Sequence, residues 1–291
     1  MNRLVYVVFL ALFVLGGETA LTTPFFTQDP RTLPAGKWRV ETHLLSSHYE
    51  HSLVDGDEVP LLSGDSASAS TYQTRIRYGA ADKLTLFVDI PYVRKTVCAG
   101  GVRRISNGRG DVDLLAKYNI HDDRARGTRA AVALSTKLAT GDYRNLPPEL
   151  ALGTGQTNWI LVLLGEKQVG IDTYYASVAY VDTGERTDVD TDPGQVFRAN
   201  VAIEHKVGDS PCNIVGELNY FHQGRFERVG ETVETSGSTI LNAAIGAQYA
   251  PRLQPGRLLI VESEIQFPIH SAGYSAALPD YTYYLGAWTV F

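Results

Sequence analysis

Apolar and polar residues alternate with a period of two along most of the chain after residue 37, which is the pattern of β-strands with one apolar face. Near the start of this region, Trp38 and Val40 share one face, and Arg39 and Glu41 share the other. The charged face needs water or ion partners, so these strands cannot be buried on both faces in a dry core. The alternation predicts about twelve strands, at 37–49, 70–79, 83–94, 110–121, 128–139, 156–167, 171–183, 195–207, 213–223, 237–250, 257–268 and 281–291. Apolar residues occur at both parities within 156–167, so its register stays open.

The connections between these strands alternate in length. A β-sandwich has no reason to show this alternation, whereas outer-membrane barrels combine short periplasmic turns with long extracellular loops. We therefore predict an all-β fold, a transmembrane antiparallel up-and-down β-barrel of about twelve strands with both termini in the periplasm. The long connections are 50–69, 95–109, 140–155, 184–194, 224–236 and 269–280, and the short ones are 80–82, 122–127, 168–170, 208–212 and 251–256.

The first residues have the form of an export signal. Met1-Asn2-Arg3 is followed by an apolar run to Gly17, too short for a membrane helix and typical of a signal peptide. We assign 1–20 to this signal, with cleavage between Gly16 and Ala20, 21–36 to a periplasmic N-terminal segment, and 37–291 to the barrel. The predicted location is the outer membrane of a Gram-negative bacterium.

Composition narrows the classes of function. The mean hydropathy is only −0.10, as expected when strands alternate lipid-facing and lumen-facing residues. Sixteen Tyr, three Trp and ten Phe suit aromatic girdles at the two membrane interfaces. The net charge of −6 leaves no basic footprint for nucleic acid. Cys98 and Cys212 fall at opposite ends of the predicted barrel and are expected to stay unpaired.

The C-terminal residues combine an alternating apolar face with a terminal aromatic residue. This pattern resembles the signal by which the barrel-assembly machinery recognises its clients, which makes that machinery an expected partner. The predicted assembly signal consists of Tyr283, Leu285, Ala287, Thr289 and Phe291.

Polar residues at the opposite parity are expected to line the lumen. Both signs of charge occur, and a barrel of this size lies between eight strands, which side chains fill, and sixteen, which leave an open channel. Two interpretations follow for these residues, a selectivity lining and a closed network of salt bridges. The candidates are Arg39, Glu41, Arg75, Arg77, Asp89, Asp113, Lys117, Arg129, Lys137, Arg198, Glu204, Lys206, Glu217, Glu262 and Glu264.

Catalytic and metal motifs are weak. The acidic loop 188–194 lacks the Glu that an EF-hand needs eleven residues after its first Asp, since Ala199 stands there. Outer-membrane hydrolases place Ser and His together, but no acid at a diagnostic spacing accompanies the local Ser and His residues. We therefore predict no enzyme activity, no catalytic residue, no metal and no cofactor. The Ser and His residues considered are His43, Ser46, Ser47, His48, His51 and Ser52.

Four short segments resemble a family of outer-membrane barrels associated with the meta-pathway of phenol degradation and regarded as transporters. They are 89–93 (DIPYV), 110–118 (GDVDLLAKY), 137–142 (KLATGD) and 152–155 (LGTG), where Ala139 replaces the usual Pro. The order and spacing of these segments extend the resemblance over 37–291. It implies a porin-like channel for small aromatic or hydrophobic compounds.

Together these patterns predict passive uptake of a small-molecule solute through a narrow, mixed-charge lumen. The expected surroundings are the lipid bilayer and lipopolysaccharide. One alternative is a structural or partner-binding surface barrel without transport, and a second is an outer-membrane lipid hydrolase.

Overall fold

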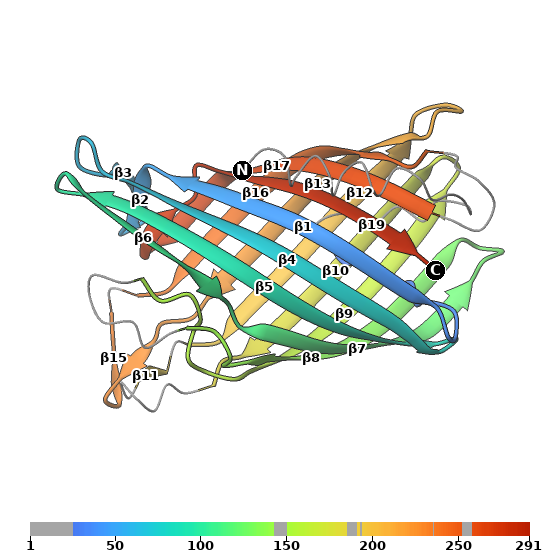
Figure 1. Cartoon of the computed structure of the whole chain (residues 1–291), viewed down its shortest axis with the longest axis horizontal. Helices are drawn as coiled ribbons and strands as arrows, with labels where there is room; N and C mark the ends of the chain where they lie inside the picture. The colour runs from blue at the N-terminus through green and yellow to red at the C-terminus, as the bar shows by residue number, and fades with distance from the viewer. Residues whose placement is uncertain (1–25, 143–149, 185–190, 193, 235, 252–257) are drawn as a thin grey trace.

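The computed structural model describes residues 26–142, 150–184, 191–192, 194–234, 236–251 and 258–291. Within them the chain is all-β, and the main sheet closes on itself as a twelve-stranded antiparallel barrel (Figure 1). The predicted signal peptide and its cleavage site lie outside the described residues. The wall strands are β1 (Trp38–Tyr49), β4 (Ser66–Ala81), β5 (Leu84–Ala99), β7 (Val112–Asp123), β8 (Thr128–Leu138), β9 (Asn158–Val169), β10 (Asp172–Asp182), β12 (Val196–Lys206), β13 (Cys212–Gln223), β16 (Ser238–Tyr249), β17 (Leu258–Gly273) and β19 (Tyr281–Val290).

The first and last wall strands close the barrel. β1 pairs with β19 in a continuous antiparallel register from Arg39↔Val290 to His48↔Tyr281. Trp38 and Phe291 extend it by two backbone hydrogen bonds of 2.9 and 3.0 Å. Because lipid cannot satisfy backbone polar groups, closure is what allows strands to cross the membrane. The up-and-down barrel predicted from alternation is confirmed.

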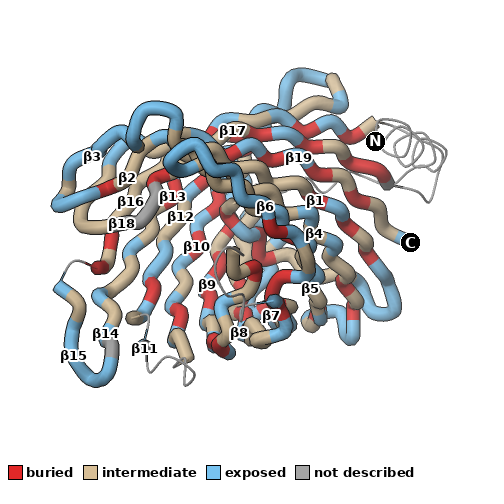
Figure 2. The backbone as a smooth tube through the Cα atoms, turned by 60° about the vertical axis from the view of Figure 1, so that its left-hand side comes forward, coloured by how far each residue is buried: buried red, intermediate tan, exposed pale blue. Residues whose placement is uncertain are grey.

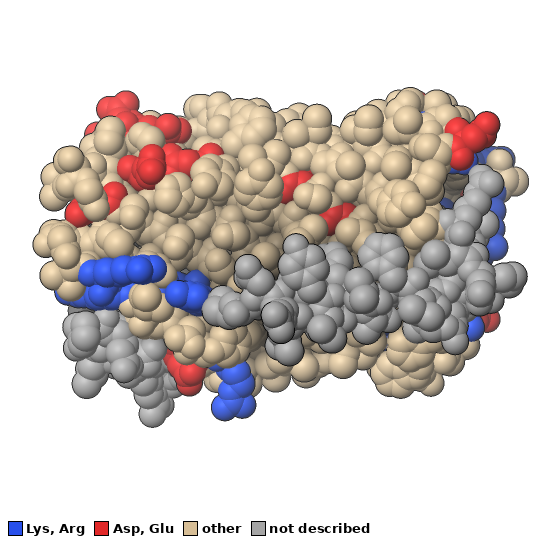
Figure 3. Space-filling view, turned by 45° about the horizontal axis from the view of Figure 1, so that its top comes forward, with Lys and Arg blue, Asp and Glu red and all other residues tan. Residues whose placement is uncertain are grey.

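Each wall strand buries one face and exposes the other (Figure 2). Leu163 and Ile245 point outward and are 56% and 57% exposed, whereas the inward Glu41 and Glu264 are 1% and 2% exposed. This inversion of the usual soluble pattern is expected where the outer surface is lipid. Charged side chains gather mainly towards the two ends (Figure 3). The described residues contain no helix long and apolar enough to span a membrane.

The two ends of the barrel differ in the way that the connection lengths predicted. Tight turns join the strands at the periplasmic end, which also holds the C-terminus, and hairpins extend from the other end (Figure 1). Several wall strands are longer than predicted at the extracellular end; β4, for example, begins at Ser66 rather than residue 70. The polar run Ser66–Ser70 lacks the apolar alternation that marks a lipid-facing strand, because it lies above the membrane. The predicted loops also contain β2 (His51–Val54), β3 (Asp57–Pro60), β6 (Val102–Arg109), β11 (Thr191–Asp192), β14 (Glu227–Arg228), β15 (Glu231–Thr232) and β18 (Ser275–Leu278).

Candidate functional site

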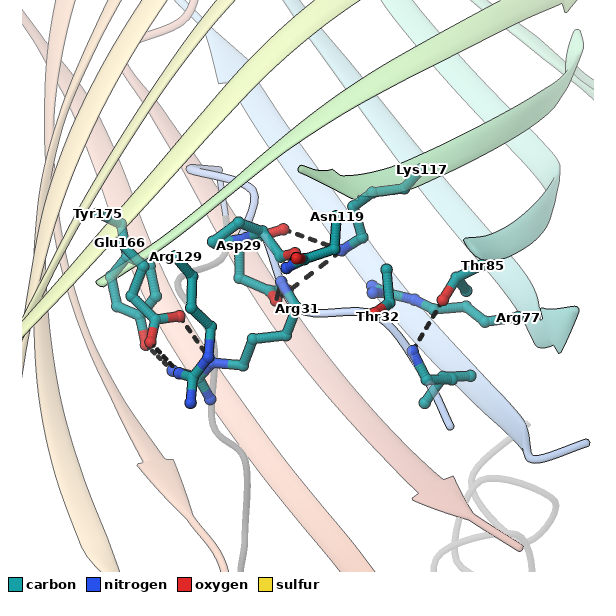
Figure 4. A network of polar contacts seen from close by, with 12 residues as sticks. Asp29, Arg31, Thr32, Arg77, Thr85, Lys117, Asn119, Arg129, Glu166 and Tyr175 are labelled. Carbon is teal, nitrogen blue, oxygen red and sulfur yellow. Dashed lines mark hydrogen bonds and ion pairs between the residues drawn. The ribbon is translucent and has the colours of Figure 1, made fainter. Parts of the chain in front are cut away.

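The lumen contains part of the chain itself. Residues 26–36, which the sequence led us to expect in the periplasm, pass through the interior before β1 begins (Figure 4). Thr27 is fully buried and Asp29 is 5% exposed. We call 26–36 the N-terminal segment. Since it makes contacts with strands on different sides of the barrel, it occupies part of the lumen and belongs to the candidate site.

Arg31 fixes the N-terminal segment to β9 and β10. Its guanidinium Nε donates to the Glu166 carboxylate at 2.8 Å, and its Nη2 donates to the Tyr175 hydroxyl (Figure 4). Glu166 also forms an ion pair with Arg129 of β8, and the Tyr175 hydroxyl donates to Glu204 at 2.9 Å. One segment residue is thus linked to a network across four strands. The neighbouring negative charges raise the pKa of Arg31 although burial opposes this, so Arg31 stays charged.

Two further contacts hold the beginning of the segment. The backbone N–H and the hydroxyl of Thr27 both donate to the Glu217 carboxylate at 2.7 Å. Lys117 of β7 donates to the Asp29 carbonyl at 2.9 Å, and its ammonium lies 3.8 Å from the Asp29 carboxylate. Burial disfavours ionisation of Asp29, but the positive charges of Lys117 and Arg31 outweigh it and lower the pKa of Asp29. The segment therefore binds the wall through charges of both signs.

The segment leaves the lumen along the turn between β4 and β5. Leu33 N–H donates to the Thr85 hydroxyl at 2.7 Å, and Gly36 N–H donates to the Gly79 carbonyl at 2.8 Å. A Cβ at Gly79 would lie only 2.0 Å from the Pro34 carbonyl oxygen. The absence of a side chain at Gly79 is what lets the segment lie against the wall here.

One side of the lumen, formed by β1, β4 and β5, is a dense charged network. The Glu41 carboxylate forms ion pairs with Arg39, whose Nε lies 2.8 Å away, and with Arg77. Arg75 donates two hydrogen bonds to Asp89, at 2.5 and 2.7 Å. Such bidentate Arg–carboxylate pairs are among the strong interactions available to buried charges. This side of the lumen is therefore rigid and highly polar.

The charged network continues onto β17 and β19. Glu262 accepts hydrogen bonds from the Tyr284 hydroxyl at 2.7 Å and the Trp288 indole N–H at 3.4 Å. The Arg39 guanidinium carbon lies 3.3 Å from the Trp288 ring centroid. Aromatic rings thus cover the charges where the network meets the closing strand, a favourable cation–π arrangement.

The inner faces of β8 and β9 carry an apolar patch. Ala131 and Ala133 of β8 pack with Val162 and Leu164 of β9 on the inner face. Between this surface and the charged network lies a cavity of about 260 Å³, lined by residues from both and by the N-terminal segment. Inside one cavity a solute would therefore meet an apolar wall and polar groups. Its lining includes Phe26, Asp29, Arg75, Phe87, Asp113, Leu115, Ile160, Val162 and Arg198.

Two polar groups of this cavity have capacity left for a ligand. Asp113 Oδ1 is buried and accepts no hydrogen bond from the described residues. Arg198 has no carboxylate within 4 Å in that part of the chain; its guanidinium carbon lies 5.7 Å from the Phe221 ring centroid. An acceptor and a donor thus flank the apolar wall, and a solute with a hydroxyl group could pair with either.

The predicted lumen residues lie on inward-facing positions, but in three groups rather than in one ring. Arg39, Glu41, Arg75, Arg77, Asp89 and Glu262 form the charged network. Lys117, Arg129, Glu204 and Glu217 hold the N-terminal segment directly or through one neighbour. Asp113 and Arg198 line the cavity, Lys137 lies 3.8 Å from Asp111, Lys206 is at an exposed strand end, and Glu264 is buried. Their role in solute selectivity stays a prediction.

The Ser and His residues considered for hydrolysis have other partners. His43 faces the lumen and lies 3.2 Å from the Glu41 carboxylate. Ser46 and Ser47 contact hydroxyls of the adjacent strands, and His51 lies 2.5 Å from Asp280. The described residues contain no group of His, Cys, Asp and Glu arranged to hold a metal ion. Both thiols are free.

Sequence reasoning missed the residues of the N-terminal segment and several of their partners. Thr27, Asp29 and Arg31 belong to a short stretch without periodicity, so no strand pattern could place them. Glu166 lies on the predicted strand whose register stays open, and Tyr175 carries no charge that would mark it as a lumen residue. The one available signal in the sequence is the pair of opposite charges Asp29 and Arg31, shortly before a strand whose inner face carries charged residues.

This arrangement defines the class of the protein: it is a β-barrel of the Gram-negative outer membrane, with an apolar lipid face and a polar, partly occupied lumen. Residues 23–267 match the family described as "Putative MetA-pathway of phenol degradation", and the chain belongs to this family. The resemblance expected from four short motifs is confirmed.

Solved structures agree with the fold. The COG4313 outer-membrane channel from Pseudomonas putida F1 has a TM-score of 0.78 at 15% identity, over 92% of this chain and 100% of that chain. The NanC porin has a TM-score of 0.48 at 10% identity, over 84% and 98%. A mutant of the monoaromatic hydrocarbon channel TodX has 0.43 at 8%, over 90% and 91%. The first shows the channel fold, and the other two are too distant to inform function. No curated protein matches the chain.

Proposed function

We propose that this protein is a passive channel that admits small aromatic or weakly polar solutes across the outer membrane, without cofactor or energy source. The observation that carries the proposal is the cavity, which combines an apolar wall with two polar groups. Within the described residues, Asp113 Oδ1 accepts no hydrogen bond and Arg198 forms no ion pair with a carboxylate within 4 Å. Such a surface suits an aromatic ring with one hydroxyl group, because the ring contacts Leu115 and Val162 while the hydroxyl meets Asp113.

Passage also requires the N-terminal segment to move. It lies between the cavity and the periplasmic end, where Gly36 pairs with Gly79. Besides the edge-to-face contact of Phe26 with Tyr284 and the buried Pro30, its contacts are hydrogen bonds and ion pairs, so we infer that it can detach without unfolding the wall. In this mechanism the solute first occupies the cavity and continues when the segment is displaced.

Uptake of radiolabelled phenol by porin-deficient cells tests the proposal, because their lipopolysaccharide leaflet slows direct permeation of apolar solutes. Cells with the wild-type protein should take up phenol faster than cells with an empty vector. Asp113→Ala should reduce this increase in uptake more for phenol than for toluene, because toluene has no hydroxyl group to donate to Asp113. Asp209→Ala, on the exposed turn between β12 and β13, is the matched control.

The same measurement decides between transport and a surface barrel without transport, an alternative that the obstructed lumen favours. Equal uptake with vector and with folded wild-type protein would support the latter. A variant with Thr27→Val, Asp29→Asn and Arg31→Gln adds a second readout, since detaching the segment should raise ion conductance in planar bilayers. An unchanged conductance would show that the lumen is closed by the wall itself.

A further inference from the structure

Above the membrane, the hairpin of β5 and β6 carries a row of arginines on its outward face. Arg94 lies on β5, and Arg103 and Arg109 lie on β6; all three are exposed. Arg94 is paired with Asn107, so Arg109 is its diagonal neighbour on the same face, where Cα atoms are about 7–8 Å apart. Arg103 lies further along the hairpin opposite Cys98. We call these three residues the arginine face.

The arginine face lies just outside the aromatic girdle. Arg109 is paired with Tyr92, which is paired in turn with Tyr72 on β4, and both tyrosines are outward and exposed. Tyrosines at such positions mark the interface between hydrocarbon and headgroups. The Tyr92 hydroxyl donates to Asn107 Oδ1 at 2.7 Å, which links the girdle to the arginine face. Arg94 and Arg109 are therefore at the height of lipid headgroups.

The arginines of this face have no acidic partner within the described part of the chain. No carboxylate lies within 4 Å of any of the three guanidinium groups, whereas most lumen arginines form ion pairs. Placing three like charges on one hairpin is unfavourable unless an anion from outside neutralises them. One group of basic side chains lies at the end of the molecule that carries this hairpin, and another lies at the opposite end (Figure 3).

The hairpin is held rigidly from its inner side. Lys95 donates to the Ala151 carbonyl at 2.6 Å, and Leu150 N–H donates to the Ser106 hydroxyl at 2.8 Å. Consecutive strand pairs from Tyr92↔Arg109 to Ala99↔Val102 fix the register. The backbone that presents the arginines is thus preorganised, which lowers the entropic cost of binding a ligand.

We propose that the arginine face binds the phosphate groups of lipopolysaccharide in the outer leaflet. Guanidinium groups bind phosphate oxygens with paired N–H···O hydrogen bonds, and their charge is always present. Arg94 and Arg109 together face one phosphate at headgroup height, and Arg103 faces the phosphorylated sugars further out. The lipid would bind beside the channel, and its binding does not depend on transport.

The test is native mass spectrometry of the refolded protein with bis-phosphorylated lipid A in detergent. Wild-type protein should retain the lipid, and the variant with Arg94→Gln, Arg103→Gln and Arg109→Gln should bind it about tenfold or more weakly. A matched control removes three exposed charges from the periplasmic turns, Lys83→Gln, Arg124→Gln and Arg126→Gln. The control should bind as the wild type does.

Three outcomes would overturn the proposal. Equal affinity of the arginine variant and wild type would show that the arginines take no part. Equal binding of lipid A stripped of its phosphates would show that only the acyl chains matter. Competition by inorganic phosphate at millimolar concentration would assign the face to free anions instead. Heat-modifiable gel mobility confirms that each variant is folded, and normal phenol uptake by the arginine variant separates this result from the proposed channel function.

Discussion

At the scale of single residues, the fit between the N-terminal segment and the wall depends on a missing side chain. Gly79 admits the Pro34 carbonyl at a place where any Cβ would clash. We therefore expect Gly79→Ala to lift the segment from the β4–β5 turn and to increase the open time of the channel in planar bilayers. Gly246→Ala is the control for a steric clash elsewhere in the wall, because a Cβ at Gly246 would meet the Ser263 carbonyl of the neighbouring strand and not the N-terminal segment. A similar open time in the two variants would contradict the expectation.

Asp29 makes the attachment of the segment sensitive to acid. Its pKa in the folded protein is below the usual value, so its ionised form contributes stability above pH about 4 and loses that contribution as the pH falls through the lowered pKa. Conductance of wild-type channels should rise as the pH decreases below about 4. Asp29→Asn removes the ionised form, so it should be more open at neutral pH and change less on acidification. Identical pH profiles would rule Asp29 out.

Residue patterns also show where prediction from sequence ends. The inward position of Glu41 follows from its alternation with Val40 and Thr42, and Glu41 is 1% exposed in the structure. The contact of Thr27 with Glu217 does not follow, because these residues are 190 positions apart and no periodicity connects them. The local alternation of residues determines whether a strand residue points inward or outward. The contacts of an irregular segment depend on the tertiary structure of the folded barrel.

At the scale of elements, the lipid face of β7 should be sensitive to charge. Leu114 is outward and 41% exposed in the middle of the wall. Leu114→Arg should lower the free energy of unfolding by about 2–4 kcal/mol, because a guanidinium near the bilayer midplane loses its hydration. Ile105→Arg is the control, since Ile105 is 44% exposed on the hairpin above the membrane. Urea titration in lipid vesicles measures both, and equal losses would contradict the assigned membrane level.

The closing strand offers a second test at this scale. Tyr283, Leu285 and Phe291 are exposed on the lipid side of β19, and Ala287 and Thr289 are at the same parity. Deleting Phe291, or Tyr283→Asp, should reduce folded protein in the outer membrane, because both the proposed assembly signal and the pairing with Trp38 lie there. Tyr274→Asp, outside any strand, is the control. Wild-type amounts after the deletion, measured by fractionation and heat-modifiable mobility, would show that the terminal Phe is incidental.

Elements were predictable to different degrees for a physical reason. The wall strands repeat one environment, lipid on one side and polar lumen on the other, and this repetition is visible as alternation. The hairpin extension Ser66–Ser70 is surrounded by water and protein loops, so its residues carry no such pattern although they form a strand. The sequence therefore predicts strands that are too short at the extracellular end, whereas it locates the turns at the periplasmic end.

At the scale of the whole molecule, the barrel and the N-terminal segment behave as receptor and tethered ligand. In the proposed mechanism the segment, which is joined to β1 through Gly36, would compete with a solute at the high effective concentration of an intramolecular ligand. A solute with modest affinity would displace it only for brief periods, so flux would be set by the equilibrium of this competition rather than by lumen width alone. Cutting the chain between the segment and β1 should remove this high effective concentration.

A barrel that begins near residue 37 should therefore conduct freely. A synthetic peptide of residues 26–36 should close it again only at about millimolar concentration, which is the order of effective concentration that a short tether supplies. An Arg31→Gln peptide should fail to do so.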